Sequence, residues 1–203
     1  MGHARAATGG TPSGPHDNAN NHPFFGKLSR IAMIHNGTVD DDLWRKTVGK
    51  EGGINPKYDF EGQTDSELFL RMVETCLESC ATMEEAIADA AYNIEGNYAL
   101  VFIRETEPSK IWFVKHNNPI VFALNEKSSY IVWGSTPDII QHALTTYKFH
   151  LDYFCEPVSP KLVYEDQGDE SIVTIELIDA EPWFKISARD FIPKGSKIHG
   201  GSY

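Results

Sequence analysis

Five residues in the first third of the chain combine groups that could hold and activate a small zwitterion: Arg5, Thr8, Asn36, Gly37 and Asp65. The planar guanidinium of Arg5 matches a carboxylate, and the carboxylate of Asp65 is a counter-charge for an ammonium group. An asparagine amide beside a glycine N–H offers two donors to an oxyanion that develops on an attacked carbonyl. The set predicts chemistry on the amide or acyl group of an amino acid, but it contains no nucleophile.

Each of these residues also has a purely structural interpretation. Arg5 could be an ordinary solvated arginine, and Asn36-Gly37 is a common turn sequence. Asp65 falls within Thr64-Asp65-Ser66-Glu67, a capping-box pattern that marks the start of a helix, so it could cap that helix instead of, or in addition to, binding a ligand.

The composition favours one globular domain spanning residues 1–203. A net charge of -11 argues against a nucleic-acid surface, which requires clustered basic residues. No apolar run approaches the roughly 20 residues that cross a bilayer, and no signal peptide opens the chain. We therefore expect a cytoplasmic protein without a nucleic-acid or membrane partner.

The cysteines and histidines give little support for a metal site. Cys76 and Cys80 are four residues apart in a helical pattern and are expected to be small core residues, with Cys155 as a third reduced thiol. A closed zinc site would need two further ligands beside that pair. Four histidines near the N-terminus have irregular spacing: His3, His16, His22 and His35. We expect no metal and no cofactor.

Helical periodicity and capping signals predict four helices. A short one is expected over 40–50 and the clearest over 65–80, where apolar residues repeat on one face. A second capping pattern at Thr82 opens a helix to about residue 94, with Ala86, Ile87, Ala90 and Ala91 facing inward. Ser135-Thr136-Pro137-Asp138 begins the last helix. The helices over 65–80 and 82–94 should lie side by side.

Strand patterns dominate the rest of the chain. A short buried strand at 31–34 should run into a turn at His35-Asn36-Gly37, and residues 1–30 should be loop. Consecutive strands predicted at 98–104, 110–115, 120–125 and 129–134 suggest an antiparallel meander. Further strands are expected at 148–154, 161–164, 171–177 and 183–187. Grouped helices and consecutive strands indicate an α+β fold. Trp112, Phe113 and Trp133 are expected in its core.

Several motifs in order resemble the class II glutamine amidotransferase domain. The resemblance rests on Gly2-His3-Ala4-Arg5-Ala6-Ala7-Thr8-Gly9-Gly10, Asn21-His22-Pro23-Phe24, His35-Asn36-Gly37 and Thr64-Asp65-Ser66-Glu67. Gly96-Asn97-Tyr98-Ala99-Leu100 and Asn118-Pro119 followed by Ser135 also fit, so it covers roughly residues 1–145. Each motif alone is weak, but four in the family's order are specific.

This resemblance implies an N-terminal-nucleophile hydrolase fold, a four-layer α-β-β-α sandwich of antiparallel sheets. It implies hydrolysis of the L-glutamine side-chain amide to glutamate and ammonia. Arg5 would pair with the α-carboxylate of glutamine, and Asp65 with its α-ammonium. Asn36 and Gly37 would form the oxyanion hole. Ammonia would pass to an acceptor, normally in a separate synthase domain.

The resemblance also assigns Thr8 and His22 to the glutamine pocket, and it exposes one departure from the family. Family members begin with a cysteine whose thiolate attacks the amide, whereas this chain starts at the Gly2-His3 motif. In that family the free α-amino group of the N-terminal cysteine acts as the base, and a cysteine within a helix has no such group. We therefore expect an N-terminally truncated domain without a nucleophile, inactive as written, which a complementing N-terminal segment could complete.

Two other functions compete with a glutaminase. The first is a non-catalytic module that binds glutamine or a related amino acid and regulates or scaffolds a synthase. The second is a structural interaction domain whose site has decayed, for which substitution of Arg5 or Asp65 would change no affinity.

Overall fold

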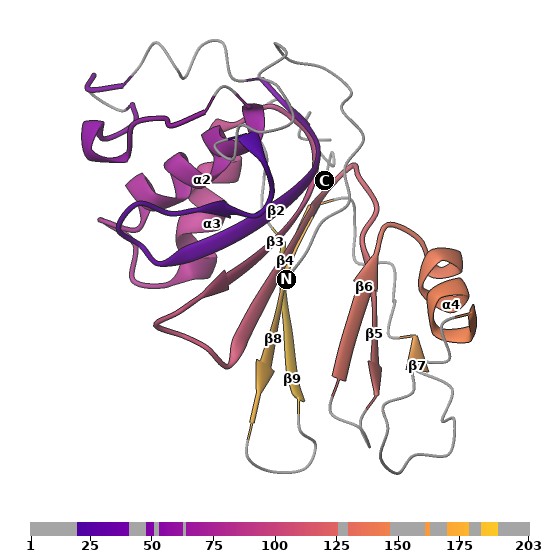
Figure 1. Cartoon of the computed structure of the whole chain (residues 1–203). Helices are drawn as coiled ribbons and strands as arrows, with labels where there is room; N and C mark the ends of the chain where they lie inside the picture. The colour runs from indigo at the N-terminus through magenta and orange to yellow at the C-terminus, as the bar shows by residue number, and fades with distance from the viewer. Residues whose placement is uncertain are drawn as a thin grey trace, which may run out of the picture.

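The computed structural model describes residues 20–40, 48–50, 53–62, 64–125, 130–146, 161–162, 170–178 and 184–190. Within them the chain forms two antiparallel sheets and three α-helices (Figure 1). The predicted helix over 40–50 falls largely outside these ranges, as do the strand at 148–154, Cys155 and the two site residues Arg5 and Thr8.

The larger sheet has six strands, all paired antiparallel in the order β1-β2-β3-β4-β8-β9. The strands are β1 (Phe24–Phe25), β2 (Ile31–Val39), β3 (Gly96–Arg104), β4 (Lys110–His116), β8 (Glu170–Leu177) and β9 (Phe184–Asp190). Central strands such as β3, with the sequence GNYALVFIR, are apolar along most of their length because both faces of the sheet are covered.

Helices α2 (Asp65–Cys76) and α3 (Met83–Asn93) cover one face of this sheet and lie side by side, as predicted (Figure 1). Thr82 begins α3 by accepting a hydrogen bond from the Glu85 N–H at 3.2 Å. The four inward positions predicted for α3 are fully buried. The core beneath the helices contains the β3 side chains Tyr98, Leu100 and Phe102.

The smaller sheet has the order β6-β5-β7 and faces the other side of the large sheet (Figure 1). Its strands are β5 (Val121–Asn125), β6 (Tyr130–Gly134) and β7 (Lys161–Leu162), and α4 (Pro137–Thr146) packs on it through Ile140. Phe113 of β4 stacks on Phe122 of β5 with ring centroids 5.3 Å apart, and it meets Trp133 of β6 edge-on at 5.6 Å. Aromatic side chains thus join the two sheets.

The α+β class with antiparallel sheets is confirmed, and three local predictions are wrong. β4 pairs with β8 and not with β5, so the four consecutive strands form two hairpins in different sheets rather than one meander. β2 runs on to Val39, so His35-Asn36-Gly37 lies inside a strand and not in a turn. The short strand β1 also interrupts the loop expected over 1–30. None of the helices in the described part of the chain is long and apolar enough to cross a membrane.

Candidate active site

The C-terminal part of β2 presents Asn36 and Gly37 on an exposed stretch of an otherwise buried strand. Gly37 has a φ of 138°, and a Cβ at this position would lie 2.0 Å from the backbone oxygen of Asn97 on β3. Residues with a side chain rarely adopt such a φ, and their Cβ atoms essentially never approach another atom this closely. Residue 37 must therefore be glycine for β2 and β3 to approach each other here.

Asp65, the first residue of α2, lies against the same end of β2. One carboxylate oxygen accepts a hydrogen bond from the Val39 N–H at 2.9 Å, and the other accepts from the Ser66 N–H at 2.9 Å. Val39 is only two residues beyond Gly37, about 7 Å along an extended chain. The fold therefore brings three of the predicted site residues, Asn36, Gly37 and Asp65, to one place.

The position of Asp65 suits a ligand cation as well as a helix terminus. Its side chain is half-buried, and an ionised carboxylate has roughly four acceptor sites, of which the two backbone N–H groups use two. Asp65 lies in the first turn of α2, where acidic side chains are commonly found. The structural and ligand-binding interpretations of Asp65 are thus compatible.

The capping box predicted at Thr64 does not form in the expected way. Thr64 occupies the N-cap position of α2 but makes no side-chain capping hydrogen bond. The carboxylate of Glu67, which a capping box would turn back to Thr64, instead accepts from the N–H groups of Glu61 and Gly62 at 2.8 and 2.7 Å. Glu67 has a stronger partner elsewhere, in Arg71.

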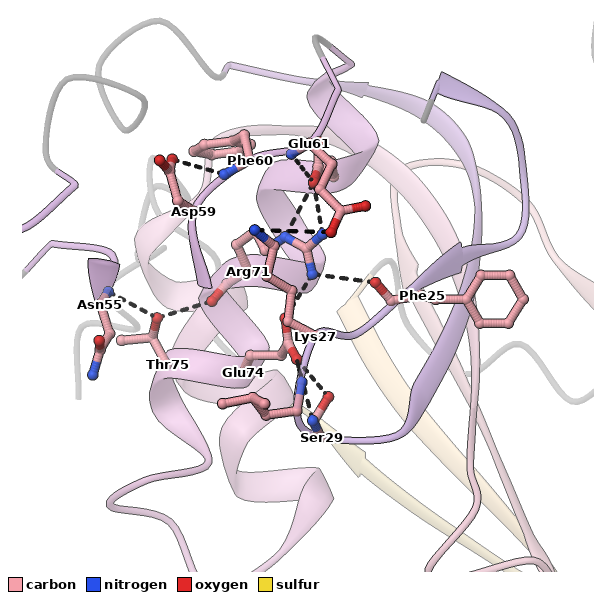
Figure 2. Close-up of polar contacts among 12 residues, drawn as sticks. Phe25, Lys27, Ser29, Asn55, Asp59, Phe60, Glu61, Arg71, Glu74 and Thr75 are labelled. Carbon is pink, nitrogen blue, oxygen red and sulfur yellow. Dashed lines mark hydrogen bonds and ion pairs between the residues drawn. The ribbon is translucent and has the colours of Figure 1, made fainter. Parts of the chain in front are cut away.

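Arg71, Glu67 and Glu74 form a buried ionic cluster on α2, of which Figure 2 labels Arg71 and Glu74. The guanidinium contacts Glu67 Oε1 and Glu74 Oε2, both at 2.7 Å, and donates to the Phe25 carbonyl oxygen at 3.2 Å. Glu74 also accepts from the Ser29 hydroxyl at 2.8 Å. We call Glu67, Arg71 and Glu74 the ionic cluster. It fastens the 25–29 segment and the 61–62 segment onto α2.

Sequence reasoning missed the ionic cluster, although its signal is present. Glutamates three and four residues from an arginine share one helix face. No role was predicted for that face from the sequence, whereas all three side chains are at most 3% exposed.

Two further residues at the site were also missed. His35 is buried, and its Nδ1 lies 2.8 Å from the Ser66 hydroxyl, which ties β2 to the first turn of α2 beside Asp65. Asn118 follows β4 and donates from its side-chain amide to the backbone oxygen of Asn36 at 3.0 Å. The Asn118-Pro119 motif was noticed in the sequence, but it was given no role.

His22 precedes β1 and packs edge-on against Phe24, with ring centroids 4.7 Å apart. Phe24 pairs with Met33 in an antiparallel register, so the chain before Phe24 runs in the direction of the Asn36 end of β2. This direction is compatible with the predicted place of His22 in the pocket. Arg5 and Thr8 lie outside the described residues.

Neither Cys76, the last residue of α2, nor Cys80, four residues further along the chain, has the properties of an activated nucleophile. Burial raises the pKa of Cys76 to about 12, and the carboxylate of Asp89 acts in the same direction. The pKa of the Cys80 thiol is also raised, first by burial and then by its hydrogen bond to Asp89. Catalytic thiols instead have lowered pKa values. Cys76 ends α2, at the opposite end of the helix from Asp65, and Cys80 follows in the turn after it.

Comparison with proteins of known function points to one family. The chain is 30% identical over 147 residues to the glutamine–fructose-6-phosphate aminotransferase (isomerizing) of Clostridium acetobutylicum, a match that covers 72% of this chain. It is 27% identical over 176 residues to the enzyme of the same name from Chlorobaculum tepidum, covering 86% of this chain. The chain spans only 22% and 25% of the lengths of these relatives. No protein-family model matches it.

Solved structures show the same fold. A glutamine phosphoribosylpyrophosphate amidotransferase from B. subtilis, complexed with ADP and GMP, superposes over 91% of this chain with a TM-score of 0.56 and 14% identity. The match covers 33% of that chain. A second structure, described as the allosteric regulatory enzyme of purine biosynthesis, gives a TM-score of 0.51 over 83% of this chain. The sequence matches over 72% and 86% of the chain, together with this fold, show that the chain belongs over most of its length to the class II glutamine amidotransferase family, as the motifs predicted.

Proposed function

We propose that this domain binds L-glutamine where the end of β2 meets the start of α2. Asp65 pairs with the α-ammonium group, Arg5 with the α-carboxylate, and Asn36 and Gly37 face the side-chain amide. One observation carries the proposal: the Asp65 carboxylate contacts Val39, two residues beyond Gly37 on the same strand. This separation is comparable to the length of an extended glutamine side chain, so one molecule can reach both groups.

The proposed reaction is hydrolysis of the glutamine side-chain amide. A thiolate attacks the amide carbon, and the oxygen becomes an oxyanion that the Asn36 side chain and the Gly37 N–H stabilise. The amide nitrogen is protonated and leaves as ammonia, and water then hydrolyses the thioester to glutamate. Thr8 and His22 shape the pocket, and a synthase domain is the proposed acceptor of ammonia.

The order helix pair, sheet, sheet, helix supports the assignment to the N-terminal-nucleophile hydrolase sandwich. In that class the nucleophile carries a free α-amino group, which acts as its base. Position 1 of this sequence is methionine, position 2 is glycine, and the three cysteines are at 76, 80 and 155. We propose that these 203 residues bind glutamine and that hydrolysis requires a nucleophile of that kind.

Calorimetric titration of the 203-residue chain with L-glutamine tests the binding proposal. D65N should weaken binding roughly 10- to 100-fold, because a charge-assisted contact to the ammonium group is lost. D59N is a charge-matched control, since Asp59 is exposed and, among the described residues, its carboxylate accepts only from the neighbouring Phe60 N–H at 2.7 Å. Equal effects of the two substitutions, or no binding by the unsubstituted chain, would contradict the proposal.

A non-catalytic glutamine-binding module is the second candidate, favoured by the high pKa of Cys76 and the raised pKa of Cys80. A glutaminase assay on the native gene product, run beside the titration, separates the two. Release of ammonia from glutamine supports the amidotransferase. Saturable binding with no release of ammonia supports the regulatory or scaffolding module.

A further inference from the structure

Asn118 makes an unusual pair of contacts at the site. Its side-chain nitrogen lies 3.0 Å from the Asn36 carbonyl oxygen and 3.3 Å from the Asn97 carbonyl oxygen. Both neighbours are acceptors, so the side-chain atom that faces them must be the NH₂ group. One carboxamide therefore bridges the backbones of β2 and β3 from a residue 82 positions away from Asn36.

The loop after β4 holds Asn118 in this place. Asn117 adopts a φ of 59°, and the Asn118 N–H donates to the His116 carbonyl oxygen at 2.7 Å. The Asn117 side chain turns to the Asn97 side chain, with 2.9 Å between Nδ2 and Oδ1. These contacts aim Asn118 at the backbone of β2 and leave Asn117 at the periphery.

The contact with Asn36 has a consequence for Gly37. The carbonyl of one residue and the N–H of the next belong to one planar trans peptide and point in opposite directions. A bond that holds the Asn36 oxygen therefore also sets the direction of the Gly37 N–H. Glycine has no side chain to restrain its own backbone, and the Asn118 nitrogen lies only 2.6 Å from the place of a Cβ on Gly37.

We propose that Asn118 is a positioning residue for the oxyanion-stabilising peptide: its carboxamide fixes the Asn36–Gly37 peptide plane so that the Gly37 N–H points toward the developing oxyanion. That Asn118 fixes the orientation of the Asn36–Gly37 peptide follows from the geometry alone. That this orientation affects catalysis rests on the function proposed above. Oxyanion stabilisation depends on donors that are oriented before charge develops, so a residue that only holds the peptide affects the rate.

The direction of the Gly37 N–H can be measured directly. Residual dipolar couplings of the aligned, nitrogen-15-labelled chain report the orientation of each N–H bond. N118D keeps the shape of the side chain but replaces its donor by an acceptor, and N118L removes all hydrogen bonding at similar volume. Both should change the Gly37 coupling, whereas couplings in β4 and α3 should stay as in the unsubstituted chain.

N117G is the matched control. It removes the neighbouring carboxamide, and glycine tolerates the positive φ at this position. It should leave the Gly37 coupling unchanged. If N118D does not fold, N118L provides the same comparison without a new charge beside two carbonyl groups. An unchanged Gly37 coupling in a folded Asn118 variant would overturn the proposal.

Turnover by the native gene product tests the catalytic meaning. N118L should lower kcat on the order of 100-fold, as a displaced catalytic group does, and change KM for glutamine less than about threefold. A purely structural role would change neither constant beyond the loss of folded protein. A rise in KM at constant kcat would overturn the positioning role. The Gly37 coupling could change in N118L although the unsubstituted protein neither binds nor hydrolyses glutamine. In that case the proposed function fails, but the inference that Asn118 orients the Asn36–Gly37 peptide stands.

Discussion

Asp65 and Glu67 are two residues apart in the same motif, yet their carboxylates have opposite surroundings. Glu67 is fully buried and accepts from two backbone N–H groups and from Arg71. Asp65 is half-buried, accepts from Val39 and Ser66, and keeps capacity for further donors. The comparison shows that the residue type alone does not tell whether a carboxylate has a structural role or binds a ligand. What distinguishes the two is whether residues of the protein already provide all the hydrogen-bond donors and the counter-charge that the carboxylate needs.

The ionic cluster should dominate stability, so removing its centre gives the largest expected effect. R71M leaves Glu67 and Glu74 buried without their cation, which should lower the free energy of unfolding by about 3–5 kcal/mol. Urea unfolding measures the change. R30M is the control, because the Arg30–Glu105 pair is 63% and 69% exposed and should contribute less than about 1 kcal/mol. A similar loss of unfolding free energy in R71M and R30M would show that the buried cluster stabilises the fold no more than the exposed Arg30–Glu105 pair.

Substitution of Gly37 should cause the next largest loss of stability, because the backbone at this position of β2 tolerates no side chain. G37A combines a positive φ with a Cβ 2.0 Å from Asn97 O, and it should destabilise the fold on the order of 3 kcal/mol. G134A is the matched strand control, since its Cβ would meet Ile140 at an ordinary 3.4 Å. Thermal unfolding of both variants decides the point. Wild-type stability in G37A would mean that β2 and β3 can separate at this position.

Replacing the carboxylates of Glu67 and Asp65 by amides tests whether Glu67 has a structural role and Asp65 a ligand-binding role. E67Q should lower the free energy of unfolding by roughly 1–3 kcal/mol, because a buried charged hydrogen-bond network is broken, and it should leave glutamine affinity unchanged. D65N should lower stability by less than about 1 kcal/mol, the usual contribution of an acid at a helix N-terminus. Its main effect should be on affinity. Urea unfolding and calorimetry on both variants provide the measurements. A loss of affinity in E67Q and a larger loss of stability in D65N would show that the two roles are assigned wrongly.

The smallest expected effect is the pH dependence of Glu84. Burial alone would raise its pKa, but hydrogen bonds from Trp112 at 2.8 Å and from Thr174 at 2.9 Å, with others, leave the pKa below the ordinary 4.5. A lowered pKa means that the carboxylate stabilises the fold above 4.5 and that this contribution disappears as the pH falls through the folded-state pKa.

E84Q should therefore be less stable than the unsubstituted chain at neutral pH, and the difference should narrow as the pH falls below 4.5. Urea midpoints across this pH range provide the measurement. E105Q, at an exposed carboxylate, is the control. A difference that stays constant with pH would show that Glu84 acts by shape and not by charge.

The local signals in the sequence predicted the helices and most strands correctly. The spacing of Ala86, Ile87, Ala90 and Ala91 specified the buried face of α3, because helical periodicity is local. The pairing of β4 with β8 was missed, because register between distant strands depends on packing that no short pattern contains. The turn predicted at Asn36-Gly37 failed for the same reason: pairing with β3 holds the pair in a strand.

The same distinction applies to the site. Motif order marked Asn36, Gly37 and Asp65, and the fold places them together. It could not reveal the ionic cluster, because burial of a glutamate–arginine face depends on the segments that cover it, including Phe25 and Ser29. Nor could it assign Asn118, whose contact with Asn36 spans 82 residues.

The most direct test of the account is to observe where glutamine binds. L-glutamine titrated into the nitrogen-15-labelled chain should shift the amide signals of Asn36, Gly37, Val39 and Ser66 in a saturable way. Signals of Arg71 and Glu74, roughly two turns further along the same helix, should shift far less. Binding that leaves the Asn36–Val39 signals unchanged and perturbs another surface would contradict the account, as would the absence of any saturable shift.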